Sequence, residues 1–180
     1  MVEKIAPLLL TSEALITLSL EDAKIVASYM TVSRLAPETV VFQANQTDVA
    51  SDYMLLVLEG EILIEALSSG DSTVIVNVLG AGHLIGEMGV LDGGPRSATC
   101  TAQTDVEVAL LTRSRLEEVM EDHPRIASRF LMAIAKRLAD RVRLGNHKLL
   151  MLNQVNDAMR EEMNAKSRKR PHRFVTDTVV

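Results

Sequence analysis

The chain has 180 residues, 47% of them hydrophobic, which is enough for one domain with a sizeable core plus an additional segment. Its formal net charge is −5, and its single cysteine excludes an internal disulfide, an iron–sulfur cluster held by this chain alone and a cysteine-rich zinc site. No segment reads as a secretory leader, and no apolar run reaches the ~18 residues of a membrane span. These features predict a soluble cytoplasmic protein.

The first clear structural signal is a helix start at Ser19. Ser19 followed by Asp22 at the third helical position is typical of a capping box, and apolar residues follow at helical spacing. We expect a helix of about a dozen residues here. Pro37 then ends the helical pattern.

Short segments rich in β-branched residues follow, separated by polar turns. The expected strands are 39–42, 53–58, 61–67, 73–79, 97–102 and 106–111. Gly60 and the pair Gly70-Asp71 predict tight turns between them, and Asn45 predicts a turn residue because asparagine tolerates a positive φ. Many short strands at this spacing indicate an α+β protein built on a small antiparallel β-barrel or jelly roll.

Two helices are expected after the strands. Thr112 can cap a short helix that runs through Met120, and Pro124 suits the first position of the next helix. Residues 125–162 contain no proline and keep a helical apolar period. The chain therefore closes with a long helix over about 125–165.

The apolar residues of this long helix recur three and four positions apart, as in a coiled-coil seam. They form two stripes, Leu131, Ile134 and Leu138, then Leu152, Val155 and Met159, with Arg141, Gly145 and Lys148 at the positions between. The first stripe could pack on the chain's own barrel. Because ~38 helical residues span about 57 Å, longer than a small barrel, part of the helix must find another partner or remain exposed, and a parallel homodimer is the simplest partner.

Residues 82–99 are the most informative stretch. Their glycines allow a close backbone approach to a ligand, and successive N–H groups in such a loop can form an anion-binding concavity. Arg96 offers a planar fork for two phosphate oxygens, and Glu87 can accept hydrogen bonds from a sugar hydroxyl. A phosphate beside a hydroxyl points to a nucleotide.

The pattern Gly86-Glu87, then Gly89, then Pro95-Arg96-Ser97-Ala98 resembles the phosphate-binding cassette of the cyclic nucleotide-binding domain family, which includes the bacterial catabolite activator and the regulatory subunits of cyclic-AMP-dependent kinase. The resemblance implies that Glu87 binds the ribose 2′-hydroxyl, that Arg96 binds the cyclic phosphate and that the Ser97 hydroxyl completes the phosphate site. It also implies base contacts from the long helix, where the corresponding positions carry Arg141 and Val142. The expected binding residues are Gly86, Glu87, Met88, Arg96, Ser97, Ala98, Arg141 and Val142.

By this resemblance the chain is a cyclic nucleotide sensor that prefers cyclic AMP, because serine follows the cassette arginine; cyclic GMP is the other possible ligand. The expected organisation is a helix and barrel over 1–124, a dimerisation or lid helix over 125–165 and a basic, then polar tail over 166–180. Only this tail follows the long helix, so no DNA-reading head and no sequence-specific DNA binding are expected. The downstream protein partner is not identified by the sequence.

Other functions were weighed against this one. The four histidines lie far apart and in no metal-binding spacing, and no nucleophile accompanies the acids, so no metal site, no catalytic residue and no enzyme activity are predicted. His83 is expected to be a turn residue and Cys100 a small core residue. Two alternatives remain open: an oligomerising adaptor with little or no nucleotide binding, and a DNA-associated regulator that uses the net +4 tail.

Overall fold

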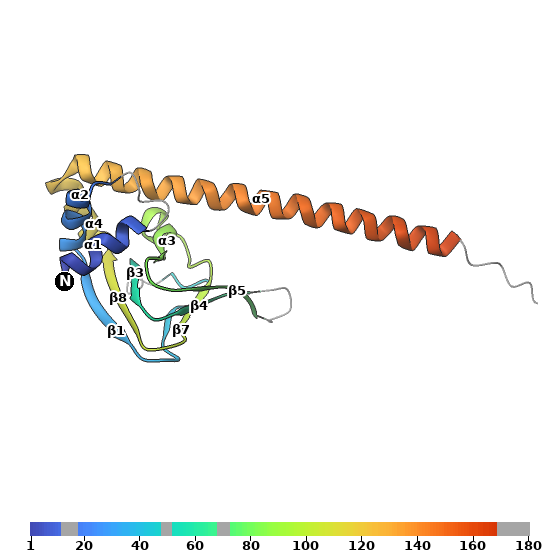
Figure 1. Ribbon diagram of the computed structural model, residues 1–180, viewed down its shortest axis with the longest axis horizontal. Helices are drawn as coiled ribbons and strands as arrows, with labels where there is room; N and C mark the ends of the chain where they lie inside the picture. Colours follow the sequence, from blue (N-terminus) through green and yellow to red (C-terminus); the bar gives the residue numbers. More distant parts are fainter. Residues whose placement is uncertain (12–17, 48–51, 68–72, 169–180) are drawn as a thin grey trace, which may run out of the picture. The chain divides into compact units, whose positions relative to one another are not determined.

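The computed structural model describes residues 1–11, 18–47, 52–67 and 73–168 of the chain. The chain forms two compact units, Met1–Arg137 and Leu138–Val180. The first unit contains all the strands and four complete helices among the described residues, together with the beginning of the long last helix (Figure 1). The described part of the second unit consists of the remainder of that helix.

The first unit is a jelly roll made of two four-stranded sheets. One sheet has the order β1-β8-β3-β6, from Thr31–Leu35, Val106–Thr112, Tyr53–Glu59 and Leu84–Ile85. The other has the order β2-β7-β4-β5, from Val40–Phe42, Thr99–Ala102, Ile62–Leu67 and Thr73–Leu79. All neighbouring strands are antiparallel, which confirms the predicted α+β jelly roll.

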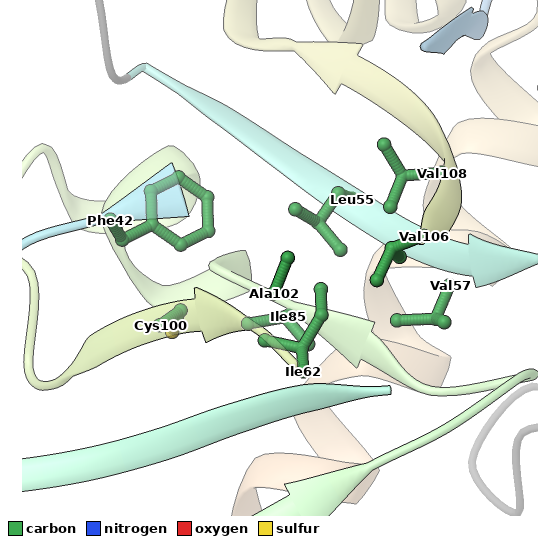
Figure 2. Packing of buried hydrophobic residues seen from close by; sticks show 9 residues of the cluster. All are labelled: Phe42, Leu55, Val57, Ile62, Ile85, Cys100, Ala102, Val106 and Val108. Atoms are coloured by element: carbon green, nitrogen blue, oxygen red, sulfur yellow. The ribbon is translucent and has the colours of Figure 1, made fainter. Parts of the chain in front are cut away.

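The core lies between the two sheets and is filled by inward-facing residues of six strands. Its buried members are Phe42, Leu55, Val57, Ile62, Ile85, Cys100, Ala102, Val106 and Val108 (Figure 2). Phe42 and Cys100 lie at one end of this cluster, and Val57 and Val108 lie at the other. The predicted core position of Cys100 is confirmed, because the residue is 4% exposed.

Helices α1 (Val2–Thr11), α2 (Leu20–Ser28) and α4 (Arg113–Asp122) gather at one end of the sheets (Figure 1).

The capping box predicted at Ser19 is present, because the Ser19 hydroxyl accepts from the Asp22 N–H and the Asp22 carboxylate accepts from the Ser19 N–H. Asp22 also pairs with Arg129 of the last helix at 2.9 Å. Burial alone would raise the pKa of the Asp22 carboxyl, but the Ser19 and Arg129 bonds outweigh it and hold that pKa below its usual range.

The expected helix after Ser19 is too long. Helix α2 ends at Ser28, and Thr31–Leu35 forms strand β1 instead. The sequence analysis also assigned no structure to Val2–Thr11, which is α1. β1 was not predicted because its residues show no regular alternation of buried and exposed positions. Its extended conformation is set by pairing with β8, which is distant in the sequence.

The turns that were predicted from single residues are present. Gly60 and Asn45, two of the predicted turn residues, have φ values of 85° and 66°, and Gly82 has a φ of 84°, so all three lie in the left-handed region. His83 follows the Gly82 turn, and its Nδ1 is 3.0 Å from the Gly80 carbonyl, as expected of a turn residue. The predicted Gly70-Asp71 turn lies outside the described residues.

The last helix, α5, runs over Pro124–Arg168, with Pro124 at its first position as predicted. Its residues 124–137 belong to the first unit, where Ala127, Phe130, Ala133 and Ile134 are buried. Ile134 of the first apolar stripe is therefore buried by packing within the chain's own first unit.

Helix α4 begins after Thr112, whose hydroxyl accepts from the Arg115 N–H, so the predicted cap is confirmed.

Candidate functional site

We call residues 82–99 the cassette. The segment contains β6 and a short helix, α3 (Glu87–Asp92), where the sequence predicted a loop. Gly86 precedes α3 at φ 84° and Gly93 follows it at φ 67°, where the Gly93 N–H donates to the Gly89 carbonyl at 2.9 Å. Left-handed backbone at both ends explains why glycine occupies both positions.

Arg96 lies inside the cassette and is only 6% exposed. Its Nη1 donates to the Gly86 carbonyl and its Nη2 donates to the Tyr53 carbonyl, each at 2.8 Å. The Arg96 Cζ lies over the ring of Phe42, 3.9 Å from the ring centroid. The guanidinium is therefore held by two hydrogen bonds and by contact with an aromatic ring.

The backbone of Arg96 is fixed by the turn at Asn45. The Arg96 N–H donates to the Gln46 carbonyl at 3.0 Å, and the Arg96 carbonyl accepts from the Asn45 N–H at 2.8 Å. The Ala44 N–H donates to the Thr99 hydroxyl at 3.1 Å. The turn that the sequence analysis identified at Asn45 thus positions the segment that carries the arginine.

Two cassette glycines make room for the guanidinium. A Cβ atom at Gly86 would lie 2.9 Å from Arg96 Nη1 and 2.9 Å from two ring carbons of Phe42. A Cβ atom at Gly89 would lie 2.8 Å from the same Nη1. Real Cβ atoms do not approach other heavy atoms this closely, so any side chain at either position would displace Arg96.

Glu87, the first residue of α3, is 2% exposed and is the second buried charge of the cassette. Its charge and that of Arg96 both influence the thiol of Cys100, in the neighbouring strand β7. Burial, opposed by Arg96 and assisted by Glu87, raises the pKa of Cys100 from its ordinary 9.0 to about 12. Glu87 and Arg96 are thus the two buried charges of the cassette.

A second arginine, Arg113 at the start of α4, holds the cassette from another side. Its Nη2 donates to the Gly89 carbonyl at 2.8 Å, and its Nε donates to the Asp52 carboxylate at 2.6 Å. The hydrogen bond to Asp52, opposed by partial burial, raises the pKa of the Arg113 guanidinium above its ordinary value. No local sequence pattern links residues 61 positions apart, so this pair is not predictable from the sequence.

The structure brings most of the predicted binding residues into one segment. Glu87 and Arg96 are buried, Met88 is 41% exposed, Ser97 is exposed and Ala98 is half-buried. Buried charges thus lie beneath a more exposed rim, an arrangement suited to an anion that also carries hydroxyl groups. Arg141 and Val142 belong to the second unit, so base contacts from these residues stay a prediction.

The described ranges, 1–11, 18–47, 52–67 and 73–168, contain no group of three or more histidine, cysteine, aspartate or glutamate side chains placed to hold a metal ion. No described helix is long and apolar enough to cross a membrane.

Fold and cassette together define a small-ligand-binding jelly roll, and comparison with known proteins gives the family. Residues 32–123 match the family described as the cyclic nucleotide-binding domain. That match covers half of the sequence, so the chain belongs to the cyclic nucleotide-binding domain family, as its cassette indicated.

Three relatives illustrate the similarity. The HTH-type transcriptional regulator Cmr of Mycobacterium tuberculosis is 32% identical over 119 residues, which cover 66% of this chain and 47% of Cmr. The CRP-like cAMP-activated global transcriptional regulator of the same species is 25% identical over 87 residues, covering 48% of this chain and 39% of the regulator. The chain thus spans less than half the length of either regulator.

The third relative is a solved structure. A cyclic nucleotide-binding domain from Methylobacillus flagellatus superimposes with a TM-score of 0.71 at 26% identity, and the match covers 83% of this chain and 82% of that domain. The similarity therefore extends over about four-fifths of both chains and supports the same jelly-roll fold.

Proposed function

We propose that this protein binds cyclic AMP through the cassette and acts as a sensor of that nucleotide, without catalysing a reaction. One observation carries the proposal. Among the described residues the buried polar or charged side chains are Asp22, Glu87 and Arg96, so two of the three belong to the cassette. Buried charges are costly to maintain and give little net stability, which favours a binding role for both.

Glu87 and Arg96 divide the recognition between them in this proposal. The Arg96 guanidinium pairs with the cyclic phosphate, assisted by the Ser97 hydroxyl and by backbone around Gly86, Met88 and Ala98. The Glu87 carboxylate accepts from the ribose 2′-hydroxyl. Burial strengthens both interactions, because the local dielectric constant is lower than that of water.

The preference for cyclic AMP over cyclic GMP has two supports. The residue after the cassette arginine is Ser97, which the resemblance associates with cyclic AMP. One relative is named as a cAMP-activated regulator. Contacts of Arg141 and Val142 with the purine would complete the site, with Arg141 stacked on the base.

We further propose that α5 pairs with the α5 of a second copy. The second unit carries nine apolar side chains that are 51–65% exposed, among them Leu152, Val155 and Met159 of the predicted seam. Exposed apolar residues in such numbers are typical of an interaction surface. The same observation supports the adaptor function as a second candidate, in which assembly through α5 matters more than nucleotide binding.

The buried, free Cys100 supports a place in the reducing cytoplasm.

The experiment compares cyclic AMP with its 2′-deoxy analogue, using calorimetry on the wild-type chain and on Glu87→Gln. We expect the analogue to bind the wild type more weakly by about 1.5–3 kcal/mol, the scale of a hydrogen bond to a charged group. In Glu87→Gln that difference should shrink. Glu117→Gln, the same change at an exposed position of α4, serves as the control and should behave as wild type.

A titration with cyclic GMP measures the preference for the base. Weaker binding of cyclic GMP is the expected result. Equal affinities for the two nucleotides would contradict the cyclic AMP preference, and no binding of either nucleotide would favour the adaptor function.

A further inference from the structure

Aromatic residues are scarce in this chain, yet two of them meet at one guanidinium. The chain contains three phenylalanines, two tyrosines and no tryptophan. The Arg96 Cζ lies 3.9 Å from the ring centroid of Phe42 and 5.8 Å from that of Tyr53. The two rings are themselves neighbours, with centroids 5.0 Å apart and planes tilted by 38°.

Both rings are fixed in place by the fold. Phe42 is 1% exposed and lies at one end of the core cluster (Figure 2). The Tyr53 hydroxyl donates to the carbonyl of Val41 at 3.1 Å, which ties this ring to the strand that carries Phe42. The aromatic pair is therefore a rigid surface before any ligand arrives.

This surface complements the hydrogen bonds of the guanidinium. The bonds to the Gly86 and Tyr53 carbonyls lie in the guanidinium plane and fix how the group is turned within that plane. The Phe42 ring lies against the guanidinium, with the Arg96 Cζ over the ring, and limits how far the group can move on that side. The negative face of an aromatic ring also attracts the positive charge, and this attraction is strongest where water is excluded.

We propose that Phe42 and Tyr53 are positioning residues that hold the Arg96 guanidinium ready for an anionic phosphate. The inference rests on the proposed function and names residues outside the cassette that set its affinity. A pre-ordered guanidinium binds its ligand more tightly, because less rotamer entropy is lost on association. A guanidinium without the aromatic surface must be ordered by the ligand itself, which weakens binding.

Fluorination of the Phe42 ring is the sharpest test, since fluorine withdraws charge from the ring face and changes the ring's shape very little. The full-length chain is prepared with 4-fluoro-, 3,5-difluoro- or 3,4,5-trifluorophenylalanine at position 42. We expect the affinity for cyclic AMP, measured by calorimetry, to fall stepwise with each fluorine and to be about tenfold weaker for the trifluoro ring. Phe130, equally buried in α5, receives the same replacements as the matched control and should leave the affinity unchanged.

A second variant tests the role of Tyr53. Tyr53→Phe keeps the ring but removes the hydrogen bond to Val41, and we expect it to weaken cyclic AMP binding about two- to threefold. If wild type binds cyclic AMP and the fluorinated Phe42 series binds with unchanged affinity, Phe42 is a core residue only and the inference fails while the proposed function stands. If wild type binds no cyclic nucleotide, the proposed function itself fails.

Discussion

The cassette and the second unit's helix differ in how their side chains are partnered. In the cassette, Arg96 and Glu87 are buried, and the carbonyls of Gly86 and Gly89 each accept a hydrogen bond from an arginine. In the second unit, apolar residues from Val142 to Met163 are more than half exposed. One region has the tight packing of a binding site, and the other presents the kind of surface that a partner covers.

The same residue type illustrates this difference. Gly89 has no space for a methyl group, because a Cβ there would lie 2.8 Å from Arg96 Nη1. Gly145, in α5, has no atom within 4 Å of the position that a Cβ would occupy. A side chain at Gly89 would thus shift the Arg96 guanidinium, whereas Gly145 has no such neighbour and only lowers the stability of α5.

A large effect on assembly is expected from a charge placed in the α5 seam. Val155→Asp introduces a carboxylate at a position that is apolar in the predicted dimer, and its partner chain carries the same charge opposite. Dimer affinity, measured by sedimentation equilibrium, should fall at least about a hundredfold, the size of a hot-spot loss. Asp157→Asn, a change of charge outside the seam, is the control. A dimer that is unaffected by Val155→Asp would exclude this stripe from the interface.

Gly89→Ala should weaken cyclic AMP binding by about 1–3 kcal/mol, the usual cost of overpacking. The added methyl group displaces the Arg96 guanidinium, although alanine favours the helix itself. Calorimetry measures the affinity, and circular dichroism confirms that the fold is retained. Wild-type affinity in this variant would show that the Arg96 position seen here is not the binding position.

Alkaline pH should destabilise the first unit through Cys100, by about 1 kcal/mol at pH 10. Above pH 9 the thiol ionises in the unfolded chain, whereas in the folded chain its pKa is about 12 and it stays protonated. This contribution to stability is complete below pH 9 and declines as the pH rises towards 12. Urea unfolding of wild type and Cys100→Ala across this pH range should therefore show that the free energy of unfolding falls more steeply with rising pH for wild type. Parallel pH profiles would contradict the buried, neutral thiol.

Gly145→Ala makes the same substitution in α5. It should stabilise that helix and the dimer, whereas Gly89→Ala weakens ligand binding. We expect α5 to gain about 1 kcal/mol at most and the dimer without ligand to tighten slightly. Sedimentation with and without cyclic AMP also tests whether binding and dimerisation are coupled, since coupling must be reciprocal. Dimer affinities that respond neither to Gly145→Ala nor to cyclic AMP would make α5 independent of the ligand.

Local signals in the sequence predicted local features well. Six strands follow β-branched segments, the turns at Asn45 and Gly60 follow from residues that tolerate positive φ, and Thr112 follows from helix capping. The cassette was identified because its residues lie within one short segment.

Features that depend on distant pairings were not predictable in this way. Strand β1 exists through its pairing with β8, and the Arg113–Asp52 bond joins elements far apart in the chain. Phe42 reads as an ordinary strand residue until the fold places its ring beneath Arg96. Periodicity and spacing carry no information on which side chains meet across a core.

Calorimetry of Arg96→Leu tests the phosphate-binding role of the cassette most directly. Wild type should bind one cyclic AMP per chain. Arg96→Leu should weaken that binding by roughly a hundredfold to several thousandfold, from the ~3–5 kcal/mol lost when one partner of a desolvated ion pair is removed. Arg115→Leu removes an exposed, ion-paired arginine of α4 as a matched control and should leave the affinity unchanged. An Arg96→Leu protein that folds and binds cyclic AMP within threefold of wild type would contradict the assignment of Arg96 to the phosphate.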